Sequence, residues 1–171
     1  MPELGKKGLK VLEPCAGIGT IADRYTTITK NEVDMYDIVQ RRDDIICSDY
    51  MNVDAFDKYD LIITNFPYKN ATKANPIGFN QLLNKALNDV KPGGYVASFQ
   101  KLLQLESKKR YEEIYGRRKP EIIFVYSHRM KCFKNGDTSQ IANSAVAYSW
   151  AVWHKDMDGF FSKDTRLDWI Y

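Results

Sequence analysis

The sequence predicts an α/β fold in one domain, and two observations support this prediction. Short runs rich in β-branched and aromatic residues alternate along the chain with segments whose apolar residues recur at helical spacing. The runs are largely apolar, which is typical of parallel strands covered by helices on both faces of a sheet. The chain of 171 residues fits one domain, and its core needs neither disulfides nor a structural metal.

Strands and helices are expected in alternation along the chain. The strands are expected at residues 9–13, 32–36, 44–47, 60–64, 94–99, 121–126 and 145–153, and the helices at 18–29, 78–90 and 105–115. The run Lys91-Pro92-Gly93-Gly94 ends the second helix, because proline and glycine cannot continue it. The pair Asn135-Gly136 favours a tight turn, after which the last strand returns antiparallel.

Composition and charge narrow the class of protein. Hydrophobic residues make up 44% and charged residues 27%, which excludes a disordered, collagen-like or coiled-coil chain. The three cysteines, Cys15, Cys47 and Cys132, lack the spacing of a zinc site or redox pair, so we expect reduced thiols, no metal and a cytoplasmic protein. No apolar run is long enough for a signal peptide or a membrane span.

Basic residues concentrate in one part of the chain. Residues 101–134 contain ten lysines and arginines but only four acidic residues. A basic surface of this kind attracts a polyanion such as nucleic acid through counterion release. A solvated helix face is the alternative interpretation.

A glycine-containing turn follows the first strand, with the sequence Glu13-Pro14-Cys15-Ala16-Gly17-Ile18-Gly19. Glycines here let the backbone approach a ligand closely, and the helix that follows offers free N–H groups. Asp37 ends the second strand, where an acidic residue accepts hydrogen bonds from the ribose hydroxyls of a nucleoside cofactor. Asp49 follows the third strand and is placed to accept from an adenine amino group, with a helix or turn cap as its alternative role.

Two cofactors are compatible with this turn. Gly17, Gly19 and Ala22 satisfy a loose dinucleotide fingerprint, so a nicotinamide cofactor stays open. The Glu13 carboxylate, however, would repel a pyrophosphate and suits a cationic ligand. S-adenosylmethionine (SAM) carries an amino group and a sulfonium, and we expect it to be the cofactor. Its expected contacts are Glu13, Pro14, Cys15, Ala16, Gly17, Gly19, Asp37, Ile38, Asp49, Tyr50 and Asn65.

The tetrapeptide Asn65-Phe66-Pro67-Tyr68 follows the fourth strand and is the predicted catalytic site. The Asn65 side-chain oxygen and the Phe66 carbonyl can both accept hydrogen bonds from one exocyclic amine, while Pro67 restricts the backbone. Tyr68 can stack on the ring that carries the amine, which is worth ~1 to 3 kcal/mol for a nucleobase. An ordinary turn after a strand is the alternative.

In order and spacing, the motifs Glu13-Pro14-x-x-Gly17-x-Gly19, Asp37, Asp49 and Asn65-Phe66-Pro67-Tyr68 resemble motifs I to IV of the SAM-dependent amino-methyltransferases, above all the DNA adenine-N6 methyltransferases. The resemblance covers about residues 9–155, and its later part is similar to small phage-encoded methyltransferases. It implies a Rossmann-like class I fold, with a seven-stranded, mostly parallel sheet whose last strand is antiparallel.

By the same resemblance, Asn65 and the Phe66 carbonyl bind adenine N6, and Tyr68 stacks on the flipped base. The amine then takes the methyl group from SAM directly, with no covalent enzyme intermediate. Phe133 is expected to supply a second ring for the flipped base, with a place in the core as its alternative, and Lys131 is expected to contact the substrate. His128 and His154 belong to no acid–base constellation and are expected to be surface or packed side chains.

Several departures from the family leave alternatives open. Phe66 stands where proline is usual, and adenine-N6 methyltransferases of ribosomal RNA are similar in lacking that proline, with Asn, an aliphatic residue, Pro and Tyr in the tetrapeptide. We expect the first strand to start near residue 9, without the helix that precedes it in the family, and residues 1–171 to form a single catalytic domain with no separate target-recognition domain. We therefore expect low sequence selectivity, a partner subunit, or a single-stranded or structured RNA substrate.

The expected substrate is adenine in nucleic acid, DNA in preference to RNA. Methylation of adenine N6 in RNA or of a protein glutamine at N5 is the alternative activity, because similar tetrapeptides also serve glutamine amides. A non-catalytic subunit that binds SAM or nucleic acid is the third hypothesis.

Overall fold

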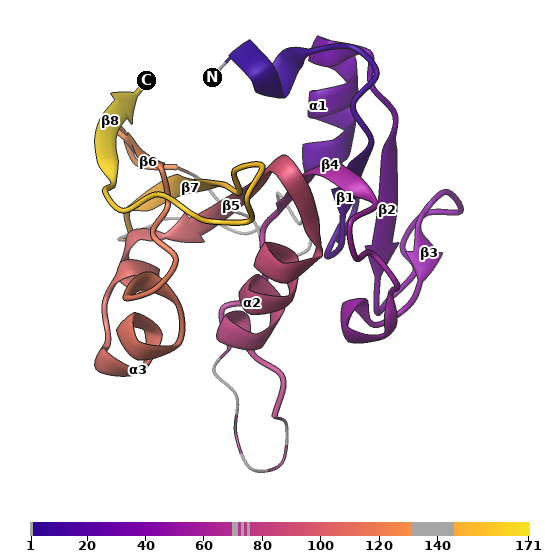
Figure 1. The fold of residues 1–171 in the computed structure, drawn as a ribbon. Helices are drawn as coiled ribbons and strands as arrows, with labels where there is room; N and C mark the ends of the chain where they lie inside the picture. Colours follow the sequence, from indigo (N-terminus) through magenta and orange to yellow (C-terminus); the bar gives the residue numbers. More distant parts are fainter. Residues whose placement is uncertain (1, 70–71, 73, 75, 131–145) are drawn as a thin grey trace.

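The computed structural model describes residues 2–69, 72, 74, 76–130 and 146–171 and contains one eight-stranded sheet (Figure 1). The strands are β1 (Val11–Glu13), β2 (Val33–Asp37), β3 (Ile46–Cys47), β4 (Tyr59–Thr64), β5 (Val90–Lys101), β6 (Ile122–Tyr126), β7 (Tyr148–His154) and β8 (Arg166–Ile170). The α-helices are α1 (Thr20–Thr29), α2 (Phe79–Asp89) and α3 (Lys108–Arg110). Short 3₁₀ turns are η1 (Pro2–Gly5), η2 (Tyr50–Asn52) and η3 (Leu102–Leu105), and a π-helical segment, η4, covers Tyr111–Tyr115.

The sheet confirms the predicted α/β fold. Its strand order is β3-β2-β1-β4-β5-β7-β6-β8, in which β1 to β5 pair in parallel and β7 runs antiparallel to both β5 and β6. The chain moves outward from β1 to β3 and then returns to β4, on the other side of β1. The carboxyl ends of β1 and β4 therefore lie side by side where the strand order reverses, which is where open α/β sheets bind ligands.

An eighth strand extends the seven-stranded sheet that we expected. β8 pairs in parallel with β6, with Phe124 beside Asp168, and lies at the edge of the sheet. Most of its side chains are exposed, so backbone pairing rather than burial holds the strand. Its sequence, RLDWI, therefore lacks the buried apolar run by which the other strands were predicted.

Two other segments differ from their predicted boundaries. β5 begins at Val90, directly after α2, and residues 91–94 form a bulge within the strand, where Gly93 has a φ of 78° that favours glycine. The helix expected over 105–115 starts only at Lys108, because the Ser107 side chain caps the N–H of Arg110. It then continues as the π-helical segment η4.

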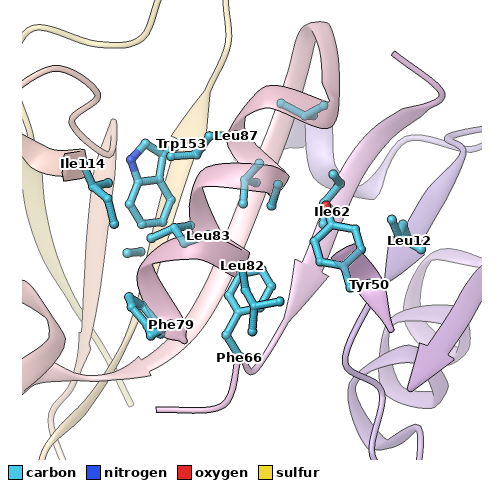
Figure 2. Packing of buried hydrophobic residues seen from close by; sticks show 14 of the residues in the cluster. Leu12, Tyr50, Ile62, Phe66, Phe79, Leu82, Leu83, Leu87, Ile114 and Trp153 are labelled. Atoms are coloured by element: carbon cyan, nitrogen blue, oxygen red, sulfur yellow. The ribbon is translucent and has the colours of Figure 1, made fainter. Parts of the chain in front are cut away.

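Helices cover both faces of the sheet, as predicted. α1 lies on one face, and α2 and α3 lie on the other (Figure 1). α2 buries apolar residues at helical spacing, among them Phe79, Leu83 and Leu87, which pack against Ile62 of β4 and Trp153 of β7 (Figure 2). This packing fixes the end of β4, from which the predicted catalytic tetrapeptide continues.

Phe66 is part of this core although it belongs to the tetrapeptide. Its side chain is 1% exposed, and its ring centroid lies 6.5 Å from that of Tyr50 and 6.3 Å from that of Phe79 (Figure 2). The tetrapeptide is thus anchored by one large buried ring.

We expect Phe66→Ala to lower the free energy of unfolding by about 3–5 kcal/mol, because it removes a fully buried aromatic ring and leaves a cavity. Phe56→Ala is the matched control, since the Phe56 side chain is 61% exposed, and it should change the free energy by no more than about 0.5 kcal/mol. Urea unfolding of the two variants measures both values. Equal losses in the two variants would contradict the placement of Phe66 in the core.

Candidate active site

The site lies at the carboxyl edge of the sheet, where the turn after β1 is bonded to the ends of its two neighbouring strands. The backbone N–H of Ala16 donates to the carbonyl of Tyr36 in β2 at 2.9 Å. The Thr64 hydroxyl at the end of β4 donates to the Cys15 carbonyl at 3.4 Å. Pro14 and Ala16 are buried and Cys15 is half-buried, so burial raises the pKa of the Cys15 thiol and keeps it neutral. Residues 14–16 thus form the buried part of the turn.

Gly17 and Gly19 both have positive φ angles, 59° and 78°. A Cβ atom on Gly19 would lie 2.5 Å from Nη1 of Arg42, which donates to the Ile18 carbonyl and also pairs with Asp23. A Cβ atom on Gly17 would have no atom of the described residues within 4 Å. Gly19 is therefore favoured by its positive φ and lies under the movable end of the Arg42 side chain, whereas Gly17 borders open space into which a ligand can approach the backbone.

Glu13 connects β1 to α1. Its side chain is 1% exposed, and Oε2 accepts a hydrogen bond of 2.8 Å from the backbone N–H of Ala22, in the first turn of α1. Gly19, the N-cap residue of α1, has no side chain to bind that N–H. Burial raises the pKa of Glu13 to about 8. Glu13 thus has a structural role, and a contact with the cofactor stays a prediction.

Asp37, at the end of β2, orders the same turn. Its Oδ2 accepts from the N–H of Gly17 at 2.8 Å, and its Oδ1 accepts from the N–H of Val39 at 2.9 Å and from Nη1 of Arg41 at 3.1 Å. A carboxylate has about four acceptor positions, so Oδ2 keeps one for a ribose hydroxyl. Next to it, the Ile38 side chain is 68% exposed and offers an apolar surface beside the open turn.

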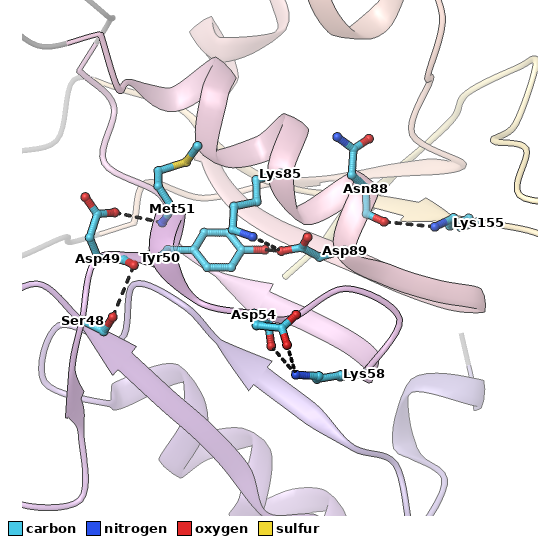
Figure 3. Close-up of polar contacts among 10 residues, drawn as sticks. All are labelled: Ser48, Asp49, Tyr50, Met51, Asp54, Lys58, Lys85, Asn88, Asp89 and Lys155. Atoms are coloured by element: carbon cyan, nitrogen blue, oxygen red, sulfur yellow. Dashed lines mark hydrogen bonds and ion pairs between the residues drawn. The ribbon is translucent and has the colours of Figure 1, made fainter.

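Asp49 and Tyr50 follow β3 and have different environments (Figure 3). Oδ1 of Asp49 accepts from the N–H of Met51 at 2.9 Å, which is the capping role considered as its alternative. Tyr50 is 1% exposed, and its hydroxyl donates to Oδ2 of Asp89 at 2.9 Å. The same oxygen accepts from Nζ of Lys85 at 2.7 Å. Because the Tyr50 ring is enclosed in the core, its backbone is the part that could reach a cofactor, and the predicted contact of Tyr50 with the cofactor stays a prediction.

The tetrapeptide after β4 alternates between exposed and buried side chains. Asn65 and Pro67 are exposed, Phe66 is buried and Tyr68 is half-buried. Since the Phe66 side chain faces the core, its backbone carbonyl is the group it can offer to a substrate. The exposed Asn65 amide and that carbonyl come from consecutive residues, as two acceptors for one amine would require.

Lys101 also belongs to this site, although the sequence did not identify it as a site residue. Its Nζ lies 5.1 Å from the centroid of the Tyr68 ring. Lys101 is the last residue of β5, which is the neighbour of β4 in the sheet. Its position at a strand end, next to the strand that leads to the tetrapeptide, was a usable signal.

The other residues considered in the sequence lie outside the described part of the chain or pack against aromatic rings. Phe133 and Lys131, together with Asn135 and Gly136, fall in the undescribed segment 131–145. The ring centroid of His154 lies 4.4 Å from that of Tyr95, and the ring centroid of His128 lies 5.4 Å from that of Tyr171. Both histidines are therefore packed against aromatic rings. Within residues 2–69, 72, 74, 76–130 and 146–171, no three His, Cys, Asp or Glu side chains gather as metal ligands, and no helix is long and apolar enough to cross a membrane.

The basic stretch does not form one uniform surface. Lys108 and Lys109 face Glu112 and Glu113 at 3.8 and 3.7 Å, as expected for a solvated helix face. Arg118 donates to the side-chain oxygens of Asn84 and Asn88 on α2 and so holds the chain to that helix. Lys108 and Lys109 thus fit the solvated helix face, whereas the attraction of a polyanion by this stretch stays a prediction.

Glu13 gives the folded protein a distinctive pH dependence. Its pKa is about 8 in the folded protein and 4.5 in a model peptide, so the folded protein binds one more proton than the unfolded chain between these values. The free energy of unfolding should therefore fall as the pH rises across this window, by at most about 1.4 kcal/mol per pH unit. Glu13→Gln should abolish this contribution, because the amide keeps an acceptor for the Ala22 N–H but does not ionise. Urea unfolding at pH 5, 6, 7 and 8 measures the slope, with the exposed Glu32→Gln as control, and an unchanged slope in Glu13→Gln would refute the assignment.

Three solved structures compare closely in fold over most of the chain. A protein from Listeria monocytogenes described as a class I SAM-dependent methyltransferase superposes with a TM-score of 0.64 and 14% identity, covering 95% of this chain and 58% of that chain. The M protein of the type I restriction enzyme EcoKI superposes with a TM-score of 0.59 and 16% identity, covering 87% of this chain and 40% of that chain. A chain of the DrdV–DNA complex superposes with a TM-score of 0.58 and 12% identity, covering 98% of this chain and 25% of that chain.

No family model and no curated protein sequence matches the chain. The chain spans less than two thirds of the length of each of these three structures. At identities of 12 to 16% the likeness concerns the fold, which is that of the class I SAM-dependent methyltransferases.

Proposed function

We propose that the protein is a SAM-dependent methyltransferase that methylates the N6 amine of adenine in nucleic acid, with DNA as its first candidate substrate. The observation that carries this proposal is the juxtaposition of two structures at one sheet edge. The open glycine turn follows β1, and the Asn65-to-Tyr68 tetrapeptide follows β4, which pairs directly with β1. A cofactor bound at the glycine turn would lie beside an amine bound at the tetrapeptide.

The residues after β1, β2 and β3 suit the parts of SAM. The turn at Gly17 has room for the backbone to approach the methionine end. The remaining acceptor position of Asp37 suits a ribose hydroxyl, while exposed Ile38 and the second carboxylate oxygen of Asp49 suit the adenine ring and its amino group. SAM would supply a methyl group activated by its positively charged sulfur.

The tetrapeptide would bind and orient the amine. The Asn65 side-chain oxygen and the Phe66 carbonyl would accept the two N–H groups of adenine N6, so that the nitrogen faces the methyl group. Methyl transfer from the sulfur would leave positive charge on the nitrogen, and the two acceptors would stabilise that charge until one proton left to solvent. Tyr68 would hold the plane of the base by stacking.

Two observations favour nucleic acid over a protein glutamine as substrate. The chain is basic in its second half, with a formal net charge of +3 overall. Two of the structural neighbours are, by their descriptions, the M protein of a restriction enzyme and a complex with DNA. RNA adenine is the second candidate, because residues that would read several base pairs in a groove are not evident from the sequence.

The first experiment supplies the purified protein with methyl-labelled SAM and, separately, unmethylated duplex DNA, single-stranded DNA, RNA and a glutamine peptide. We expect labelled N6-methyladenine in the DNA pools, detected by mass spectrometry of the digested nucleosides. Label in RNA alone would move the substrate to RNA. No label in any pool while SAM binds would refute the proposal for this chain acting alone.

The Asn65→Ala variant tests the mechanism. We expect it to lower kcat at least about 100-fold, as the loss of a preorganised transition-state contact does, while SAM binding stays largely intact through its other expected contacts. Asn52→Ala, which truncates an exposed asparagine of η2, is the matched control and should leave kcat unchanged. Full activity in Asn65→Ala would exclude the proposed role of this side chain.

A further inference from the structure

A lysine occupies one face of the ring on which the substrate base is proposed to stack. Lys101 ends β5, and its Nζ lies 5.1 Å from the centroid of the Tyr68 ring. Tyr68 lies in the segment that follows β4, and the end of β4 is paired with β5, with Thr64 beside Ser98. The contact therefore depends on the register of β4 and β5 and on the path of residues 65–68.

The Lys101 ammonium has no ion-pair partner within the part of the chain that the structure describes. Other lysines near the sheet differ in this respect. Lys85 is paired with Asp89 at 2.7 Å and Lys91 with Asp60 at 2.9 Å. Lys101 is half-buried at a strand end, so its charge is held at the site without a counter-charge among the described residues.

We infer that Lys101 is a positioning residue that leaves the Tyr68 ring when a base stacks there and then contacts the phosphate of the target nucleotide. This inference rests on the proposed function and deepens it. A ring face cannot hold a cation and a base at the same place, so entry of the base displaces the ammonium. The flexible four-carbon stem of lysine lets the charge move a few ångströms to the nearest anion, which in a nucleotide is its own phosphate.

The inference separates two classes of substrate. A nucleic acid supplies a phosphate beside every base, so the displaced ammonium gains a counter-charge as the base enters. A glutamine side chain supplies neither a ring to stack on Tyr68 nor an anion for Lys101. The pair Tyr68–Lys101 therefore selects a polyanionic, base-bearing substrate.

The test uses Lys101→Met, which keeps an apolar stem and removes the charge, and Lys101→Arg, which keeps the charge. The control is Lys108→Met, an exposed lysine on α3 whose Nζ lies 3.8 Å from Glu112. Each variant is titrated with an oligonucleotide that carries 2-aminopurine in place of adenine, over a range of salt concentrations. KM, kcat and the Kd of SAM are measured in parallel.

For Lys101→Met we expect KM to rise about tenfold, kcat to change by less than about threefold and the Kd of SAM to stay unchanged. In a plot of the logarithm of the binding constant against the logarithm of the salt concentration, the magnitude of the slope should fall by about 0.7 to 0.9. This is the contribution of one phosphate contact. Lys101→Arg should restore the slope, and Lys108→Met should leave it unchanged. If Lys101→Met does not fold, as judged by circular dichroism, Lys101→Gln replaces it.

The salt slope does not depend on turnover, so the inference and the proposed function can fail separately. Absence of methylated adenine with the wild-type protein would refute the proposed function only. An unchanged slope in Lys101→Met, an equal loss in Lys108→Met, or absence of nucleic-acid binding by the wild-type protein would refute the role of Lys101.

Discussion

The hydrogen bond from the Ala22 N–H to the buried Glu13 carboxyl group is the constraint on which the site depends. The helix α1 begins at a glycine, which cannot cap it, and the cap is supplied from the end of β1 instead. The hydrogen bond thereby links the end of β1 to the start of α1 and fixes both ends of the turn between them. Gly17 is held within this turn by Asp37 of β2, so its backbone can face a ligand without moving. A rigid turn loses little conformational entropy when a ligand binds to it.

The tetrapeptide follows the same principle of buried anchor and exposed backbone. Phe66 is packed against Tyr50 and Phe79, so the chain on either side of it has little freedom. Asn65 and Pro67 are exposed as a consequence of that burial, because their neighbour faces inward. Tyr50 takes part in both structures, since it follows β3 and packs against Phe66. A residue that we predicted to bind the cofactor thus supports the substrate side of the site.

Several parts of the fold and the site were predictable from the sequence. Apolar runs and glycine turns identified β1 to β7 and the places of Asp37 and Asp49 after β2 and β3, because these signals are local. β8 was not predictable, since its residues are exposed and its pairing with β6 depends on tertiary structure. The burial of Tyr50 and the place of Lys101 beside Tyr68 also depend on which strands become neighbours. Strand order is a property of the whole chain and leaves little trace in any one segment.

The identity of residue 66 carries less information about the substrate than its place in the motif suggests. Its side chain packs in the core, so only its backbone carbonyl is available to the proposed amine. The space between Tyr50 and Phe79 therefore determines which side chain fits there. Phenylalanine in place of proline reflects an aromatic core behind β4 and does not by itself favour RNA over DNA. The substrate has to be inferred from groups that would touch it, which are the Asn65 amide, the Tyr68 ring and the Lys101 ammonium.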